Sequence, residues 1–186
     1  GLPAGCLGAA EFSAGMSLSL SLRARADTMR ASPCGEMPMK ITIIPTENSS
    51  PTGDALLARC EAVHRQLRPQ LPSDYTERMR EILSSGAQMI AAEDESQVLG
   101  VAVFRIIENS FEGRKLYVDD LVTDESKRSQ GVGSALMNWL EAHARKTGCS
   151  TLALDSGSQR HRAHGFYFRQ GLHIASYSFR KLLDAQ

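Results

Sequence analysis

From residue 39 onward, short runs of β-branched residues alternate with segments whose apolar residues recur at helical spacing. Residues 40–44 form a β-branched run that predicts a first strand, ended by Pro45. Two stripes with apolar residues three and four apart then predict helices over about 54–68 and 75–85. The positions predicted to face inward are Leu56, Leu57, Cys60, Val63, His64 and Leu67 in the first helix, and Tyr75, Met79, Ile82 and Leu83 in the second.

The second half of the chain predicts mostly strands, with two further helices. Strands are predicted over 88–92, 98–107, 115–123 and 150–154, the last as a central strand because it is short and apolar. Gly100 within a strand indicates a bulge or a close backbone approach. Helices are predicted over 131–147 and 159–170, and one or two strands over 172–179. The inward positions of the longer helix are Val132, Ala135, Leu136, Trp139, Leu140 and His143.

This order, β-α-α-β-β-β-α-β-α-β, predicts a mixed α/β (α+β) layer fold. Residues 1–38 have no comparable periodicity and are rich in Gly, Ala, Ser and Leu. They are expected to be a leader or tail outside the fold, with residues 39–186 forming one domain. An organellar transit peptide and a leader that is not native both fit, and stray Cys and Pro residues favour the second.

Composition and charge exclude several classes of function. The 21 basic and 21 acidic residues balance, so no global field favours nucleic acid or an anionic membrane, and no apolar run has the ~18 residues of a membrane span. The four cysteines have no metal-binding spacing and indicate a reducing, cytoplasmic location rather than a disulfide framework. His161 and His164 lack a third metal ligand, so no metal site is predicted.

The turn from Arg128 to Ser134 is the strongest chemical signal. It joins a strand to an amphipathic helix and contains Gly131-Val132-Gly133. Such a turn leaves unpaired N–H groups at the positive end of a helix, where a phosphate or pyrophosphate binds. The third glycine of a dinucleotide motif and the Gly-Lys-Ser/Thr of a P-loop are both missing.

Two segments resemble the GCN5-related N-acetyltransferase (GNAT) family. Arg128-x-x-Gly131-x-Gly133 is similar to the family's acetyl-CoA motif, and Ala163-His164-Gly165-Phe166-Tyr167, followed by Gly171, is similar to its second signature. The resemblance covers the chain from about residue 40 to its end. It implies a mixed, mostly antiparallel sheet that is splayed at the cofactor site and has helices on both faces.

The resemblance also implies a site for acetyl-CoA (coenzyme A). Backbone groups of one strand would bind the pantetheine arm, and the glycine turn would bind the pyrophosphate. Arg160 and Leu172 depart from the family pattern, which often has Asn and Phe there. The implied cofactor-binding residues are Leu121, Val122, Thr123, Arg128, Ser129, Gln130, Gly131, Val132, Gly133 and Ser134.

The implied reaction is direct attack of an amine on the acetyl thioester. Tyr167 stands at the family's general-acid position and would protonate the leaving thiolate. Asp120, with Asp119 as second choice, would accept the amine proton or anchor a cationic substrate. The two are adjacent on a strand, so they face opposite sides unless a bulge intervenes. Cys149 has no adjacent base and is predicted to be a buried thiol rather than a nucleophile.

We therefore predict an N-acetyltransferase for a primary amine of a small molecule. Acidic residues could form a negative rim for aminoglycosides or polyamines, whereas Arg105 or Arg162 near the cleft would suit an amino-acid-like or aminophosphonate acceptor. Protein or peptide acetylation and non-catalytic acetyl-CoA sensing are the alternatives. A homodimer is a further expectation, because relatives are often dimers. The candidate rim residues are Glu93, Asp94, Glu95, Glu108, Glu112, Asp119 and Asp120.

Overall fold

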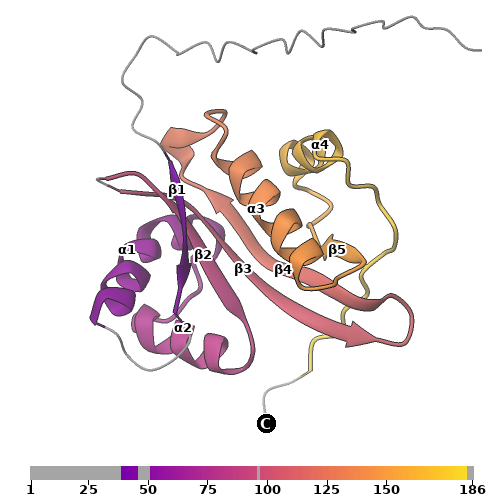
Figure 1. Cartoon of the computed structure of the whole chain (residues 1–186), viewed down its shortest axis with the longest axis horizontal. Coiled ribbons are helices and arrows are strands. Elements are labelled where there is room, and N and C mark those ends of the chain that lie inside the picture. The colour runs from indigo at the N-terminus through magenta and orange to yellow at the C-terminus, as the bar shows by residue number, and fades with distance from the viewer. Residues whose placement is uncertain (1–38, 46–50, 96, 184–186) are drawn as a thin grey trace, which may run out of the picture. The chain divides into compact units, whose positions relative to one another are not determined.

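A computed structural model describes residues 39–45, 51–95 and 97–183 (Figure 1). The leader expected over residues 1–38 lies outside these ranges. The strands are β1 (Lys40–Ile44), β2 (Gln88–Glu93), β3 (Val98–Asn109), β4 (Gly113–Thr123) and β5 (Thr151–Leu154). The helices are α1 (Pro51–Leu67), α2 (Tyr75–Ser84), α3 (Val132–Lys146) and α4 (His161–Arg169), with a 3-10 turn at Glu125–Lys127.

The five strands form one sheet in the order β1-β2-β3-β4-β5. Neighbouring strands are antiparallel except β4 and β5, which are parallel. The β4–β5 pairing runs only from Lys115 and Thr151 to Val118 and Leu154, while β4 continues to Thr123. The two strands therefore part after Val118, and the predicted mixed sheet with a splay is confirmed.

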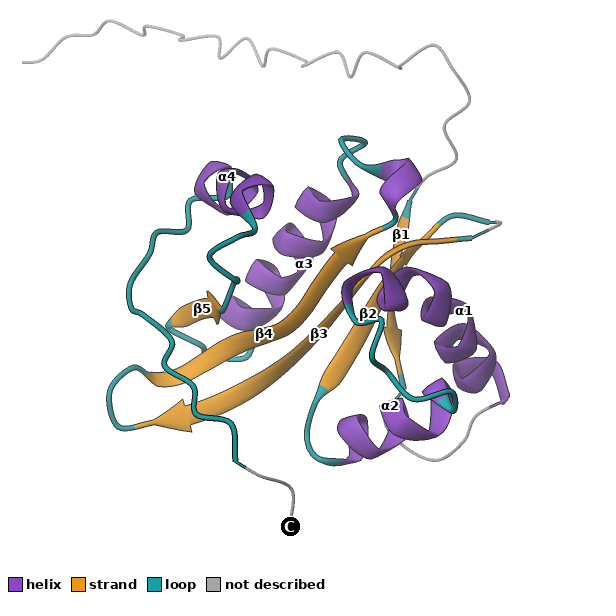
Figure 2. Ribbon diagram, turned by 180° about the vertical axis from the view of Figure 1, so that it is seen from behind, coloured by secondary structure: helices purple, strands orange, loops and turns teal. Residues whose placement is uncertain are grey.

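Helices lie on both faces of the sheet (Figure 2), and each face carries its own hydrophobic core. Alternate residues of β3 point to opposite faces, so Val101 and Val103 pack with α1 and α2, whereas Ala102 and Phe104 pack with α3. Helix α4 lies on the α3 side, where Phe166 packs against that core. Helices cover both faces, as predicted.

The predicted central position of residues 150–154 is wrong. β5 is the edge strand of the described sheet, and all four of its residues are half-buried. β5 is apolar for a different reason: Leu152 and Leu154 pack against the hydrophobic core that contains the buried residues of α3. A short apolar run does not by itself distinguish an edge strand covered on one face from a central one.

The strand predicted over 172–179 is also not formed. The backbone from His173 to Leu183 makes no hydrogen bond with any other described backbone group, and most of its side chains are exposed. The alternating pattern is present, but a strand requires a partner for its N–H and C=O groups. This segment is called the C-terminal segment below.

The inward face of α3 is turned slightly from the prediction. Met137 and Ala144 are buried, whereas Trp139 and His143 are half-buried. The Trp139 and His143 rings stack with centroids 4.8 Å apart, and both meet Phe104 edge-on. These two rings thus close the side of the core. No helix among the described residues is long and apolar enough to span a membrane.

Candidate active site

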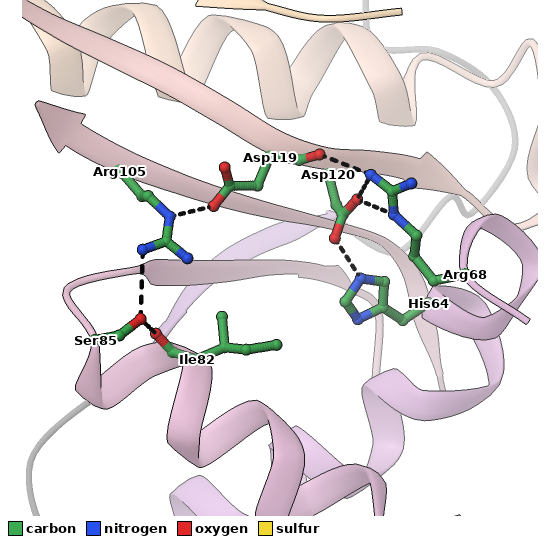
Figure 3. Close-up of polar contacts among 7 residues, drawn as sticks. All are labelled: His64, Arg68, Ile82, Ser85, Arg105, Asp119 and Asp120. Atoms are coloured by element: carbon green, nitrogen blue, oxygen red, sulfur yellow. Dashed lines mark hydrogen bonds and ion pairs between the residues drawn. The ribbon is translucent and has the colours of Figure 1, made fainter. Parts of the chain in front are cut away.

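A bulge in β4 sets the direction of two carboxylates. Val103 of β3 pairs with Asp120 and Phe104 pairs with Val118, which leaves Asp119 as an extra residue. The bulge changes the alternation of the strand, so the side chains of Asp119 and Asp120 both point to the face covered by α1 and α2 (Figure 3). The condition attached to the sequence prediction, that a bulge intervenes, is met.

Asp120 is held by two residues of α1. Its Oδ2 lies 3.0 Å from Nε2 of His64, and its Oδ1 accepts from the Arg68 guanidinium at 2.5 Å (Figure 3). His64 is fully buried, and its Nδ1 lies 3.0 Å from the Tyr75 hydroxyl. Both carboxylate oxygens of Asp120 are thus occupied, and the cluster joins β4 to α1 and the start of α2.

These contacts keep Asp120 ionised. Burial alone would raise the pKa of the Asp120 carboxyl, but the hydrogen bond and charge of His64 and the charge of Arg68 outweigh it and lower the pKa below its ordinary value. A carboxylate whose proton affinity is lowered in this way is a weak base. Burial also raises the pKa of the Tyr75 hydroxyl, which stays protonated.

Asp119 has a more open environment. Its Oδ2 accepts from Nε of Arg105 on β3 at 2.7 Å, and the Arg105 guanidinium also reaches Oγ of Ser85 at the end of α2, 3.4 Å away. The Oδ1 atom has no hydrogen-bond partner among the described residues (Figure 3). The side chain is 27% exposed, against 14% for Asp120. Asp119 is therefore the carboxylate with a free, accessible oxygen.

Tyr117 stands where β4 and β5 part. It pairs with Ala153 one position before the end of the parallel ladder, and its hydroxyl hydrogen-bonds the carboxylate of Asp155, just after β5. Burial, and then the Asp155 charge, raise the pKa of Tyr117 to about 12, while the charge of Arg180 opposes them. Arg180 of the C-terminal segment therefore lies near this point.

The glycine turn has the geometry of an anion site. Gly131 precedes α3 with φ of 85°, a left-handed conformation that glycine adopts without strain, and no side chain caps the helix. Ser129 also has a positive φ, 65°. The first N–H groups of α3 are therefore available to a ligand at the positive end of the helix. Arg128 is exposed beside them and pairs with Glu125 at 3.1 Å.

Two glycines allow close packing around this turn. A Cβ on Gly100 would lie 2.9 Å from both the Val122 carbonyl oxygen and Cγ1 of Val132, so α3 begins directly against β3 and β4. A Cβ on Gly133 would lie 3.2 Å from the Phe166 ring. The close approach predicted at Gly100 is confirmed, and it coincides with a bulge in the β2–β3 ladder.

Tyr167 lies on α4, which is joined to the start of α3. Nε2 of Gln170 donates to Oγ of Ser134 at 3.2 Å, and the Tyr167 ring meets that of Phe166 edge-on. Burial raises the pKa of the Tyr167 hydroxyl, and the positive charge of Arg160 partly offsets this. The phenol is thus kept in its protonated form, which a general acid requires.

The acidic residues predicted to form a rim mostly make ion pairs and hydrogen bonds within the described residues. The predicted negative rim consists largely of paired groups: Glu93 with Thr42 and Arg59, Glu108 with Arg114, Glu112 with Lys115, Asp119 with Arg105, and Asp120 with Arg68.

Burial raises the pKa of the Cys60 thiol to about 12, which makes it unreactive. Cys149 is half-buried rather than buried, and no group of three metal-ligating side chains occurs in the part of the chain described.

Sequence comparison decides the family. The model of the acetyltransferase (GNAT) family matches residues 56–172. This range includes His64 and Arg68 of α1, the strands β4 and β5, the glycine turn and α4. The chain belongs to the GNAT family. It is accordingly an acetyl-CoA-dependent N-acetyltransferase, and the predicted family and enzyme class are confirmed.

Two curated proteins are related to this GNAT enzyme. An uncharacterized N-acetyltransferase, YhdJ of Bacillus subtilis, is 34% identical over 62% of this chain and 84% of its own length. Aminoalkylphosphonate N-acetyltransferase of Salmonella typhimurium is 35% identical over 36% of this chain and 43% of its own length. Among solved structures, aminoglycoside N-acetyltransferase AAC(6')-Iy in complex with CoA has a TM-score of 0.69 and 17% identity, over 83% of this chain and 100% of that one. That likeness concerns the fold.

Proposed function

We propose that this GNAT enzyme transfers acetyl from acetyl-CoA to a primary amine of a small molecule, by direct attack in a ternary complex. The observation that carries the proposal is the parting of β4 and β5 after Val118, with Asp119 on one side of the opening and the α3 turn at the end of β4. Donor and acceptor could thus meet at one strand.

The cofactor would use the unpaired part of β4. Leu121, Val122 and Thr123 lie beyond the last β5 partner, so their backbone groups on that edge are free to bind the amides of pantetheine. The turn from Arg128 to Ser134 would receive the pyrophosphate through N–H groups at the start of α3. The donor would then lie along β4, with its thioester toward the bulge.

In the proposed reaction, the amine nitrogen attacks the thioester carbonyl carbon. The new C–N bond forms as the C–S bond breaks. The amine proton passes to a carboxylate, directly or through water, and the coenzyme A thiolate takes the Tyr167 proton. The contacts favour Asp119 for the first transfer, because it has a free oxygen and Asp120 has none. Asp120 would then position β4, which reverses the order preferred from sequence.

The surroundings of Asp119 favour an acceptor that carries an acid as well as an amine. Arg105 lies beside the Asp119 carboxylate, and Arg180 of the C-terminal segment adds positive charge near Tyr117, at the opening between β4 and β5. Because the acidic rim is largely paired, a polycation would find few free carboxylates there. The relationship to an enzyme named for aminoalkylphosphonates agrees with this choice. Arg162, the other basic residue considered, is exposed on α4.

A panel of amines tests the proposal. Coenzyme A release is measured with aminoalkylphosphonates, amino acids, aminoglycosides, polyamines and peptides, on the purified full chain. The proposal expects the highest kcat/KM with a small amine bearing an acidic group. Preference for an aminoglycoside or polyamine would overturn the acceptor class, and preference for peptides would overturn the small-molecule acceptor. Acetyl-CoA binding without turnover on any amine would indicate a sensor.

A further inference from the structure

Gln66, in the last turn of α1, contacts two consecutive residues that follow β4. Its Nε2 donates to Oδ2 of Asp124 at 3.1 Å, and its Oε1 accepts from the backbone N–H of Glu125 at 2.9 Å. Both polar groups of the amide are therefore used, across 58 and 59 residues of sequence. The reaction proposed above does not use Gln66, yet its two partners lead directly into the glycine turn.

Asp124 is the residue on which this part of the chain is built. Its Oδ1 accepts from the N–H and the hydroxyl of Ser126, at 2.8 and 2.5 Å. Its backbone N–H donates to the Leu99 carbonyl oxygen, and its carbonyl oxygen accepts from the N–H of Lys127, both at 2.9 Å. The hydrogen bonds from Ser126, and then that from Gln66, lower the pKa of the Asp124 carboxyl. Gln66 thus supplies the partner of the second oxygen of an ionised carboxylate.

The contacts continue from here to the residues proposed to bind the pyrophosphate. Oε1 of Glu125 accepts from Nη2 of Arg128 at 3.1 Å, and the Ser126 carbonyl oxygen accepts from Nε2 of Gln130 at 3.3 Å. Ser129 lies between them with φ of 65°, a conformation that a residue other than glycine keeps only when its surroundings impose it. An anchor at the start of the turn therefore stabilises the shape of the turn.

We propose that Gln66 is a positioning residue for coenzyme A, an inference that rests on the cofactor site proposed above. Gln66 fixes the backbone at Glu125, and the Glu125 carboxylate orients Arg128 toward the pyrophosphate. Other N–H groups of the Arg128 guanidinium remain for a phosphate oxygen. Two residues before Gln66, His64 holds the Asp120 carboxylate. One helix therefore sets the distance between the pyrophosphate site and the carboxylates of β4.

Coenzyme A affinity, measured by isothermal titration, tests this role without an acceptor. Gln66→Met keeps the length of the side chain, removes both hydrogen bonds and is expected to weaken binding about five- to tenfold. Gln66→Glu places a second carboxylate against that of Asp124 and is expected to weaken it further. Gln70→Met is the matched control, because Gln70 is exposed just after α1 and its side chain makes no hydrogen bond with a described residue. That control should bind with wild-type affinity.

A donor without a pyrophosphate separates positioning from a general loss of structure. With acetyl-CoA and the best amine of the panel, kcat/KM of Gln66→Met is expected to fall about five- to tenfold. With S-acetylpantetheine, which has the same thioester and no pyrophosphate, the variant should match the wild type. Equal losses with the two donors would overturn the proposal, because a destabilised fold would affect both. Wild-type coenzyme A affinity in both Gln66 variants would also overturn it.

A second substitution separates this proposal from the cofactor site on which it rests. Arg128→Gln is expected to weaken coenzyme A binding, and Gln66→Met should add little in that background, since its effect passes through Arg128. Fully additive losses would contradict that path. A loss confined to Arg128→Gln would exclude Gln66 and leave the cofactor site standing, whereas unchanged affinity in Arg128→Gln would remove the basis of both proposals.

Discussion

Asp119 and Asp120 are neighbours in sequence, and their side chains leave β4 on the same face of the sheet. One is paired with Arg105 of the same sheet, the other with His64 and Arg68 of α1. The bulge that turns them together also gives them different partners. Two adjacent carboxylates can therefore have separate tasks, one toward the acceptor and one toward the fold.

Replacing Asp119 by Asn is expected to reduce kcat/KM for the amine by about 100-fold at neutral pH, because the amide cannot accept a proton. The KM for acetyl-CoA should stay near the wild-type value, since Asp119 lies outside the cofactor turn. Steady-state coenzyme A release measures both constants. Glu141→Gln, at an exposed residue of α3, is the matched control. Wild-type kcat/KM in the Asp119→Asn variant would exclude Asp119 as base.

Replacing Asp120 by Asn is expected to destabilise the fold by about 1–3 kcal/mol at pH 7, because the charged hydrogen bonds to His64 and Arg68 are lost. The pKa of Asp120 is lower in the folded state, so its contribution is complete above the unfolded value of about 3.9 and disappears as the pH falls through the folded value. Urea unfolding at several pH values measures this. The wild-type and variant curves should converge only in acid, and a constant difference between them would contradict this account.

Replacing Tyr167 by Phe is expected to lower kcat by about 100-fold without changing the affinity for acetyl-CoA, because only the proton donor is removed. The ring and its contact with Phe166 remain. Single-turnover measurements with two acetyl thioesters, whose leaving thiols differ in pKa, distinguish the role. The variant should be most impaired with the thioester whose thiol has the higher pKa. Tyr177→Phe, at a tyrosine 85% exposed, serves as control.

Replacing Gly133 by Ala is expected to raise the KM for acetyl-CoA by about tenfold, because the new Cβ would meet the Phe166 ring at 3.2 Å and shift the start of α3. Isothermal titration with coenzyme A provides the affinity directly. Gly165→Ala adds the same methyl group to α4, where only Nη1 of Arg169 comes within 4 Å, at 3.5 Å. That variant should retain its affinity, and equal losses in both would show that the effect is not local.

Periodicity predicted most elements of this fold because each helix buries one face and each strand alternates. The Asp74 cap of α2 and the glycine that follows each of α2, α3 and α4 were also visible in the sequence. The edge position of β5 and the lack of a strand partner for the C-terminal segment could not be predicted in this way. Both depend on which strand lies next to which, and a single sequence does not record that.

The candidate site was predicted where backbone chemistry defines it and missed where side chains meet across elements. The glycine turn has a local pattern that identifies it. His64 was placed correctly on the inner face of α1, and a histidine among apolar positions was the signal that it needs polar partners. Its partners Tyr75 and Asp120 lie 11 and 56 residues away in the chain, so no local pattern could name them.

The hydrogen bond between Tyr117 and Asp155 has a consequence for how such an enzyme changes during evolution. It joins β4 to the residue that follows β5, at the point where the two strands separate. With a pKa of about 12, Tyr117 keeps its proton throughout the physiological range. Mutations in the surrounding helices can therefore change the side chains around this opening while the point where the two strands part is kept.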